Sequence, residues 1–167
     1  MKMKTKIIGA FTLLVMAACG SSDKSAQPDQ QPVVNQATAT KFIFKAANNK
    51  YVTVSANNFK LIADQPDAAK AEAFEIIDLG NGKSALKATS NGKFVCDNLS
   101  ESINPLQADK DHTKEWETFE IIAVDQTKVN FKSITGKFVC ANLGAGDFLQ
   151  ATQDHASDWE TFTIEAK

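Results

Sequence analysis

Residues 149–162 read LQATQDHASDWETF, and residues 106–119 read LQADKDHTKEWETF. Residues 61–74 read LIADQPDAAKAEAF and keep the same spacing of ten between the first leucine and the position of the tryptophan. The second copy starts 45 residues after the first, and the third starts 43 residues after the second. A segment that recurs three times in this way indicates an internal structural repeat.

Two further landmarks recur in the same order upstream of this segment. The nearer one is a lysine, an aromatic residue and a valine after Asn or Gly, at residues 49–53, 92–96 and 136–140. The farther one centres on an apolar residue followed by lysine, at residues 44–46, 86–88 and 131–133. The chain therefore contains three units of about 42 residues, which we call repeat one (41–79), repeat two (83–124) and repeat three (127–166).

Each repeat is predicted to form four short strands. In repeat three these strands span about 128–134, 137–142, 148–153 and 160–166, with Gly and Asn at the turns between them. Apolar residues alternate after each motif, so one face of the strand is buried, and we expect Phe74, Phe119 and Phe162 in the core. Twelve strands in three equivalent units predict an all-β fold, a β-trefoil in which three hairpins cap a six-stranded barrel. A propeller is the weaker alternative because it needs more repeats.

The N-terminal region is predicted to contain a targeting signal followed by a tether. Residues 1–18 combine lysines, a short apolar stretch and small residues before Cys19, and they resemble a bacterial lipoprotein signal peptide, with Met16 where that pattern prefers Leu. The resemblance implies cleavage before Cys19, its acylation and an anchor in the bacterial cell envelope. Ser21 stands where an Asp would retain an enteric lipoprotein at the inner membrane, which favours the outer membrane. Residues 19–40 carry few large apolar side chains and are predicted to be a disordered tether.

The repeated phrase Gly-Lys-Phe-Val-Cys-Ala-Asn, Leu-Gln-Ala-Thr and Trp-Glu-Thr-Phe resembles the fascin-like β-trefoil repeat. The resemblance covers residues 41–167, and in bacteria such domains are appended to glucanases and agarases as carbohydrate-binding modules. It implies an aromatic and an acidic residue per repeat as the sugar-binding pair. The fold alone does not decide the function, because trefoils serve many functions.

The candidate ligand-binding residues follow from that pair. Trp116 with Glu117 and Trp159 with Glu160 are suited to a pyranose, since indole stacks on its C–H face and a carboxylate accepts hydrogen bonds from hydroxyls. The competing interpretation is that each Trp covers the core at the start of a strand. Ala71 replaces the Trp in repeat one, so we expect two sugar sites rather than three.

Histidines and cysteines also recur at equivalent positions. His112 and His155 each follow an Asp, and they either line a Trp pocket or lie in a solvated loop. Threefold placement keeps equivalent residues far apart, so we expect no shared metal site and no disulfide between Cys96 and Cys140. These two cysteines are predicted to be free, half-buried thiols.

The composition of the chain argues against further classes of function. All 18 basic residues are lysines, and removal of residues 1–18 leaves 15 of them against 20 acidic residues. A chain with no arginine and a negative balance is unsuited to nucleic acid. No catalytic motif is present, so we expect a non-enzyme with no cofactor.

The sequence therefore predicts a monomeric, lipid-anchored module that binds a polysaccharide or another glycan. A protein-interaction module, such as an inhibitor or an envelope scaffold, is the alternative. Actin binding is not expected, because fascins use several trefoils together.

Overall fold

The computed structural model describes residues 40–101, 104–142, 144 and 146–167. The predicted signal peptide (1–18), the lipidation site Cys19 and the tether up to residue 39 lie outside the described residues. No helix in the described part of the chain has the length and hydropathy that a membrane span needs.

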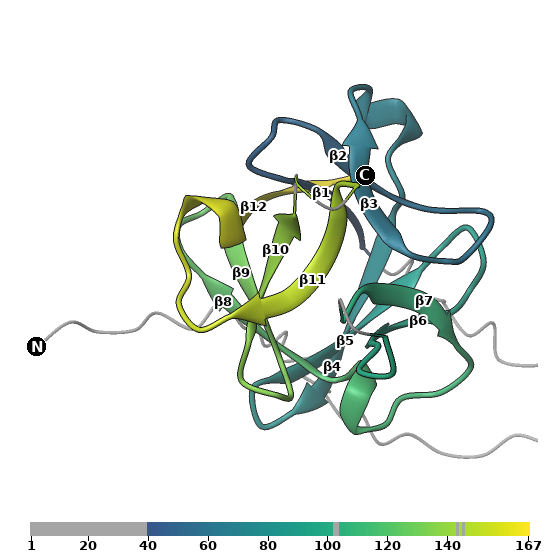
Figure 1. Ribbon diagram of the computed structural model, residues 1–167, viewed down its shortest axis with the longest axis vertical. Coiled ribbons are helices and arrows are strands. Elements are labelled where there is room, and N and C mark those ends of the chain that lie inside the picture. Colours follow the sequence, from purple (N-terminus) through teal and green to yellow (C-terminus); the bar gives the residue numbers. More distant parts are fainter. Residues whose placement is uncertain (1–39, 102–103, 143, 145) are drawn as a thin grey trace, which may run out of the picture. The chain divides into compact units, whose positions relative to one another are not determined.

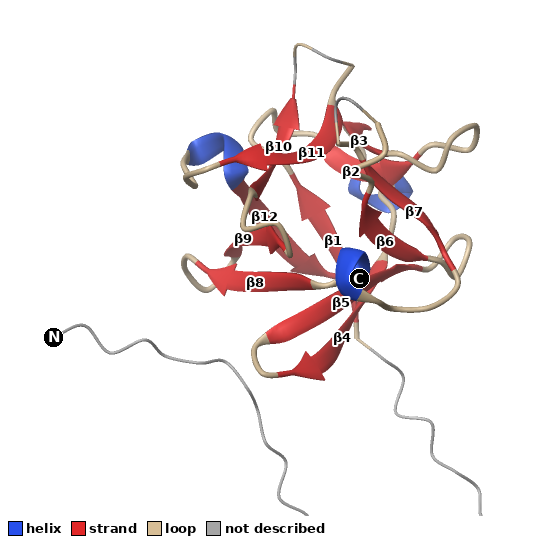
Figure 2. Cartoon of the chain, turned by 60° about the horizontal axis from the view of Figure 1, so that its bottom comes forward, coloured by secondary structure: helices blue, strands red, loops and turns tan. Residues whose placement is uncertain are grey.

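The described domain is built from twelve strands and three short 3-10 turns. The strands are β1 (Lys41–Lys45), β2 (Tyr51–Val54), β3 (Leu61–Gln65), β4 (Phe74–Gly80), β5 (Lys83–Ala88), β6 (Phe94–Asp97), β7 (Leu106–Lys110), β8 (Phe119–Ala123), β9 (Lys128–Ser133), β10 (Phe138–Asn142), β11 (Phe148–Gln153) and β12 (Thr161–Ala166). The 3-10 turns are η1 (Ala68–Lys70), η2 (Glu115–Glu117) and η3 (Asp158–Glu160), and Figure 2 shows them at separate places on the outside of the domain.

Six strands close into a barrel, in the order β1, β4, β5, β8, β9, β12 and back to β1. The remaining strands form the hairpins β2–β3, β6–β7 and β10–β11 (Figure 1). The hairpins meet one another through the pairing of β3 with β11 and through two isolated bridges. The predicted β-trefoil is thus confirmed, and ring closure leaves the barrel strands without a free edge.

The three repeats agree in register as well as in strand order. Val52 pairs with Ala63, Val95 with Ala108 and Val139 with Ala151, and each hairpin has a register shift just before that valine. The turn before each hairpin contains a residue with positive φ, at Asn49, Gly92 and Gly136. Asn and Gly tolerate that conformation, which explains why these residue types recur there.

The core is formed by side chains from equivalent positions of the three repeats. Phe74, Phe119 and Phe162 are completely buried, as the alternation pattern predicted. Valines and leucines of the hairpins pack against the same cluster. The bulk of the core therefore has threefold symmetry.

Candidate functional site

The motif Trp-Glu-Thr-Phe forms the same small structure in repeats two and three. The Trp is the middle residue of the 3-10 turn in both, and Trp116 and Trp159 are 44% and 47% exposed. The next Phe of the motif is fully buried, so the two aromatic residues point in different directions. Both Trp side chains are therefore partly exposed groups at the surface.

The glutamate beside each Trp is turned into its own loop. Glu117 and Glu160 are only 4% and 5% exposed. The Oε2 atom of Glu117 accepts a hydrogen bond from the Lys114 backbone N–H at 2.8 Å, and Glu160 Oε2 accepts one from the Ser157 N–H at 2.8 Å. The Ser157 hydroxyl donates a further bond to Glu160 at 2.7 Å. Each glutamate thus closes the turn that carries its Trp.

The threonine of the motif holds the same turn from the other side. Thr118 Oγ1 donates to the Lys114 carbonyl and Thr161 Oγ1 to the Ser157 carbonyl, both at 2.8 Å. Carboxylate and hydroxyl together satisfy the N–H and the C=O of one residue, which fixes the turn. The order Trp-Glu-Thr-Phe therefore encodes an exposed ring, two turn-closing groups and a core anchor.

The equivalent histidines lie in exposed loops before these turns. His112 and His155 are both exposed. The aspartates that precede them form ion pairs, Asp111 with Lys93 at 2.5 Å and Asp154 with Lys137 at 2.6 Å. These lysines lower the pKa of the two aspartates by hydrogen bonding and by their charge. A ligand contact by either histidine stays a prediction.

Repeat one builds its turn differently. The turn η1 ends at Lys70, two residues earlier relative to the motif than η2 and η3. Asp67 provides the cap here, because its Oδ1 accepts a hydrogen bond from the Ala69 N–H at 2.9 Å. Glu72 is not needed for capping, and its Oε1 instead accepts bonds from the N–H groups of Thr89 and Ser90 at 2.8 and 2.9 Å.

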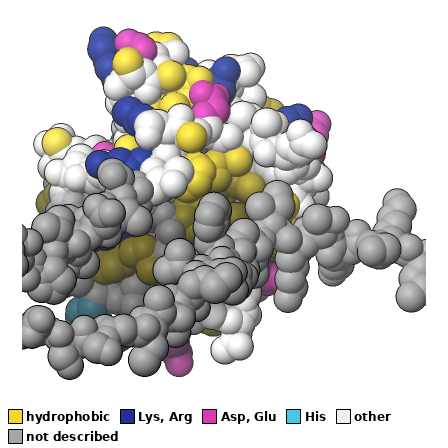
Figure 3. All heavy atoms as spheres, turned by 180° about the vertical axis from the view of Figure 1, so that it is seen from behind, with side chains coloured by type: hydrophobic (Ala, Val, Ile, Leu, Met, Phe, Trp, Pro, Cys, Tyr) yellow, Lys and Arg dark blue, Asp and Glu magenta, His cyan; other side chains and the backbone are white. Residues whose placement is uncertain are grey.

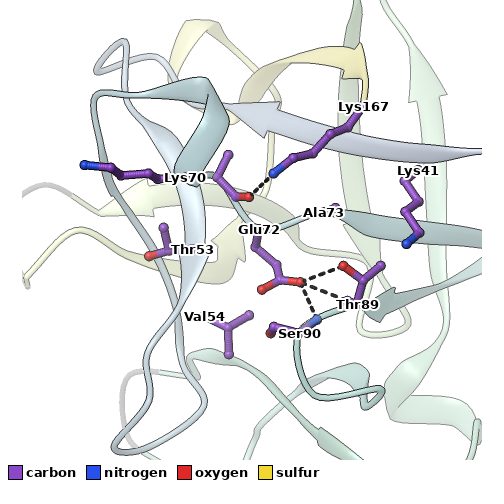
Figure 4. A pocket seen from close by; sticks show the side chains of 10 residues that line it. Lys41, Thr53, Val54, Lys70, Glu72, Ala73, Thr89, Ser90 and Lys167 are labelled. Carbon is purple, nitrogen blue, oxygen red and sulfur yellow. Dashed lines mark hydrogen bonds between the residues drawn. The ribbon is translucent and has the colours of Figure 1, made fainter.

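A hollow of about 670 Å³ opens beside Glu72, where the other repeats carry Trp-Glu. Its wall combines three lysines, three hydroxyl residues and small apolar side chains, and Figure 4 shows Glu72 at its centre. The lining residues that carry polar side chains are Lys41, Thr53, Lys70, Glu72, Thr89, Ser90 and Lys167. Its volume lies within the range of about 300–1,000 Å³ that is typical of small-molecule sites.

Sequence reasoning missed this hollow. It treated Ala71 as the loss of a sugar platform and gave no role to Lys41 or Lys167. One signal was present, since replacing a large side chain with Ala leaves space. To use this signal, one would have to know that the Glu72 side chain turns away from its own loop. That direction depends on Asp67, which caps the turn instead.

The remaining reactive groups of the described residues include two cysteines. No cluster of three or more potential metal-ligating side chains is found in this part of the chain. Cys96 and Cys140 are buried free thiols. Burial and the nearby Asp109 raise the pKa of the Cys96 thiol to about 12, so it stays protonated near neutral pH.

Comparisons with solved structures agree with the fold. A designed three-fold symmetric protein, ThreeFoil, matches with a TM-score of 0.64 at 12% identity, over 74% of this chain and 96% of that chain. SeviL bound to asialo-GM1 saccharide matches with a TM-score of 0.59 at 14% identity, over 77% of this chain and 98% of that chain.

A GlcNAcα1-4Gal-releasing endo-β-galactosidase from Clostridium perfringens matches with a TM-score of 0.63 at 12% identity, over 77% of this chain. The match covers 32% of the galactosidase, so this chain corresponds to about a third of that protein. No protein-family model matches the chain, and no curated protein matches it in sequence. The resemblance to fascin-like repeats therefore stays a prediction.

Proposed function

We propose that the protein is a non-catalytic carbohydrate-binding module whose sugar ligands stack on Trp116 and Trp159. The observation that carries the proposal is that two Trp rings at equivalent positions are about half exposed. The flat face of an exposed indole suits the C–H face of a pyranose. Two such faces on one domain would bind a polymer more tightly than either face alone.

The buried glutamates support the stacking role in a different way from the one expected from sequence. Glu117 and Glu160 fix the turn, so each indole is held in place before the ligand arrives. A preorganised ring loses less conformational entropy on binding than a mobile one. We therefore assign these glutamates a positioning role, and direct sugar contacts by them are secondary in the proposal.

The similarity to sugar-binding trefoils is consistent with this function. SeviL is bound to asialo-GM1 saccharide in its solved structure. In the galactosidase, the segment that matches this chain is part of a glycan-releasing protein. At identities of 12–14% these matches support the proposal only by analogy of fold.

Affinity electrophoresis of the full chain in gels containing β-glucan, agarose or peptidoglycan fragments tests the proposal. We expect retardation by one of these polysaccharides, a partial loss in Trp116→Ala or Trp159→Ala, and complete loss in the double variant. Phe59→Ala is the matched control, because Phe59 is 45% exposed but lies outside the Trp turns. No retardation in any gel, or equal loss in Phe59→Ala, would contradict the proposal.

We further propose that Cys19 carries the lipid anchor and that the module is held at the cell envelope, at the outer membrane. The support is the sequence pattern of residues 1–18. In Cys19→Ser the protein should move from the membrane fraction to the soluble fraction. Unchanged sedimentation with membranes would reject the anchor.

A protein-interaction module is the second candidate, and a specific observation favours it. Leu79, Val124 and Ile134 are large apolar side chains that are 40%, 53% and 42% exposed. Figure 3 shows that the face seen from behind carries apolar side chains among polar ones. A saturable protein partner that free sugar does not displace, and whose binding Leu79→Ser weakens, would favour this candidate over a lectin-like module.

A further inference from the structure

The hollow of repeat one differs in charge from the surfaces around Trp116 and Trp159. Lys167 lies at the rim of the hollow, whereas the same strand position carries Leu79 in repeat one and Val124 in repeat two. The registers β1–β12, β4–β5 and β8–β9 establish this equivalence, since Ala166, Asp78 and Ala123 pair with Phe42, Ser84 and Val129. Lys167 is thus specific to this hollow, whereas the position of Lys41 is a lysine in all three repeats, at Lys83 and Lys128 as well.

Positive side-chain charge is in excess there. Lys41, Lys70 and Lys167 line the hollow together with a single carboxylate, Glu72. Lys167 Nζ donates hydrogen bonds to the carbonyls of Ala71 at 2.7 Å and Ala69 at 3.4 Å. Among the described residues neither Lys41 nor Lys70 forms an ion pair or a side-chain hydrogen bond.

Glu72 is held so that one of its oxygens stays available. It is 9% exposed, and its Oε1 accepts the N–H groups of Thr89 and Ser90 and the Thr89 hydroxyl. Its Oε2 accepts no hydrogen bond from the described residues, and Figure 4 shows it directed away from Thr89, on the side of Thr53. A carboxylate oxygen fixed in this way is a ready acceptor for a hydroxyl donor.

We propose that this hollow binds an anionic sugar residue, a pyranose that carries a carboxylate or a sulfate group. The unpaired ammonium groups of Lys41 and Lys70 attract the anionic group, and Glu72 Oε2 accepts a hydrogen bond from a ring hydroxyl. Lysine acts as a point charge and suits either anion without demanding a bidentate geometry. The site is separate from the Trp faces, so its existence does not depend on theirs.

The test is calorimetric titration of the full chain, in non-ionic detergent, with three matched probes. These are a tetramer of galacturonic acid, the same tetramer as its neutral methyl ester, and a sulfated galactose tetramer. Amide chemical shifts of Thr89 and Ser90 report whether binding occurs at the hollow. Inorganic sulfate and phosphate measure the binding of an anion without a sugar.

The variants separate this site from the Trp faces. Lys41→Gln combined with Lys70→Gln should lower the affinity for the anionic tetramer by about tenfold or more. Added salt should lower the affinity of the wild-type protein for the same tetramer. Lys128→Gln is the matched control, because Lys128 lies at the same strand position in repeat three and is exposed. Sugar bound at the Trp faces should leave the amide shifts of Thr89 and Ser90 unchanged, so these shifts distinguish a failure of this site from a failure of the Trp sites.

We expect one of the two anionic tetramers to bind at least about tenfold more tightly than the methyl ester. Its binding should change the amide chemical shifts of Thr89 and Ser90. Binding by the galacturonate or by the sulfated probe identifies which anion is recognised. Equal affinity for acid and ester, equal losses in the Lys41/Lys70 and Lys128 variants, or no binding of either anionic tetramer would overturn the proposal. Inorganic anions that bind as tightly as the tetramers would also overturn it, because the sugar would then contribute nothing.

Discussion

The segment 67–74 of repeat one and its counterparts 112–119 and 155–162 occupy the same place in the fold and use their carboxylates differently. Asp67 caps the turn in repeat one, which leaves Glu72 to bind the N–H groups of the next repeat. Glu117 and Glu160 close their own turns and present a Trp to solvent. A carboxylate five residues earlier, together with Ala71 in place of Trp, thus accompanies an open, charged hollow instead of an aromatic surface.

The comparison predicts that the cores of the three repeats are equivalent, and this is where the largest effect is expected. Phe74→Ala, Phe119→Ala and Phe162→Ala should each lower the free energy of unfolding by about 3–5 kcal/mol, because each removes a fully buried ring. Urea unfolding measures the three losses. A loss for Phe74 much smaller than for the other two would show that the difference in repeat one extends into the core.

The next effect concerns Asp97, a buried acid in repeat two at the position of Val54 and Ala141. It is 1% exposed, and neither carboxylate oxygen has a hydrogen bond among the described residues. Asp97→Ala should raise the free energy of unfolding at neutral pH by about 1–3 kcal/mol, since it removes an unsatisfied charge. Asp97→Asn, which keeps the shape without the charge, is the control.

The pH dependence of the Asp97 effect has a definite sign. Burial raises the pKa of Asp97, although the nearby hydroxyls of Ser133 and Thr135 counteract part of the rise. The protonated form is therefore favoured in the folded state, and stability is lost as pH rises through the raised pKa. The gain from Asp97→Ala should be largest at neutral pH and shrink as the pH falls from the raised pKa of the folded state towards about 4; below that it stays at its minimum, because the acid is then protonated in both states. A gain that grows on acidification would contradict this assignment.

The turn-closing glutamates give a smaller effect. Glu160→Ala should cost about 1–2 kcal/mol of unfolding free energy, because the Ser157 N–H loses its partner. The fluorescence of Trp159 should shift as its turn loosens. Glu72→Ala is the matched change in repeat one and should leave the Trp fluorescence as it is; a shift there would mean that the turns are coupled.

The smallest effect on stability is expected for the exposed rings. Trp159→Ala and Trp116→Ala should each change the free energy of unfolding by less than about 0.5 kcal/mol, as is usual for surface substitutions. Urea unfolding followed by circular dichroism measures this without relying on Trp fluorescence. A loss of unfolding free energy close to that of Phe162→Ala would show that these Trp side chains are part of the core. The proposed difference between them and Ala71 at the surface would then be wrong.

Most of the fold could be predicted from the repeats. The expected strand at 148–153 matches β11 at both ends, and the expected strand at 128–134 is one residue longer than β9. Strand alternation placed the phenylalanines correctly, because a period of two leaves one face for the core. The expected strand at 160–166 began one residue too early, since Glu160 ends the turn η3.

The candidate site was harder to predict for physical reasons. A Trp before a core Phe fits both a buried and an exposed ring, and only the 3-10 turn decides between them. The direction of Glu72, Glu117 and Glu160 depends on which other residue caps each loop, and that competition involves a contact from the next repeat. No local pattern in the sequence contains that contact.

The neighbouring positions of β1 and β12 have a consequence for protein engineering. Phe42 lies opposite Ala166, and the Lys167 N–H donates to the Lys41 carbonyl at 2.9 Å. A short linker could therefore join the last strand to the first, and the chain could be opened instead between β4 and β5, where an added Cβ at Gly82 would meet nothing within 4 Å. Such a circular permutant would keep every strand pair of the barrel and lose only the turn between β4 and β5, so we expect it to fold into the same trefoil.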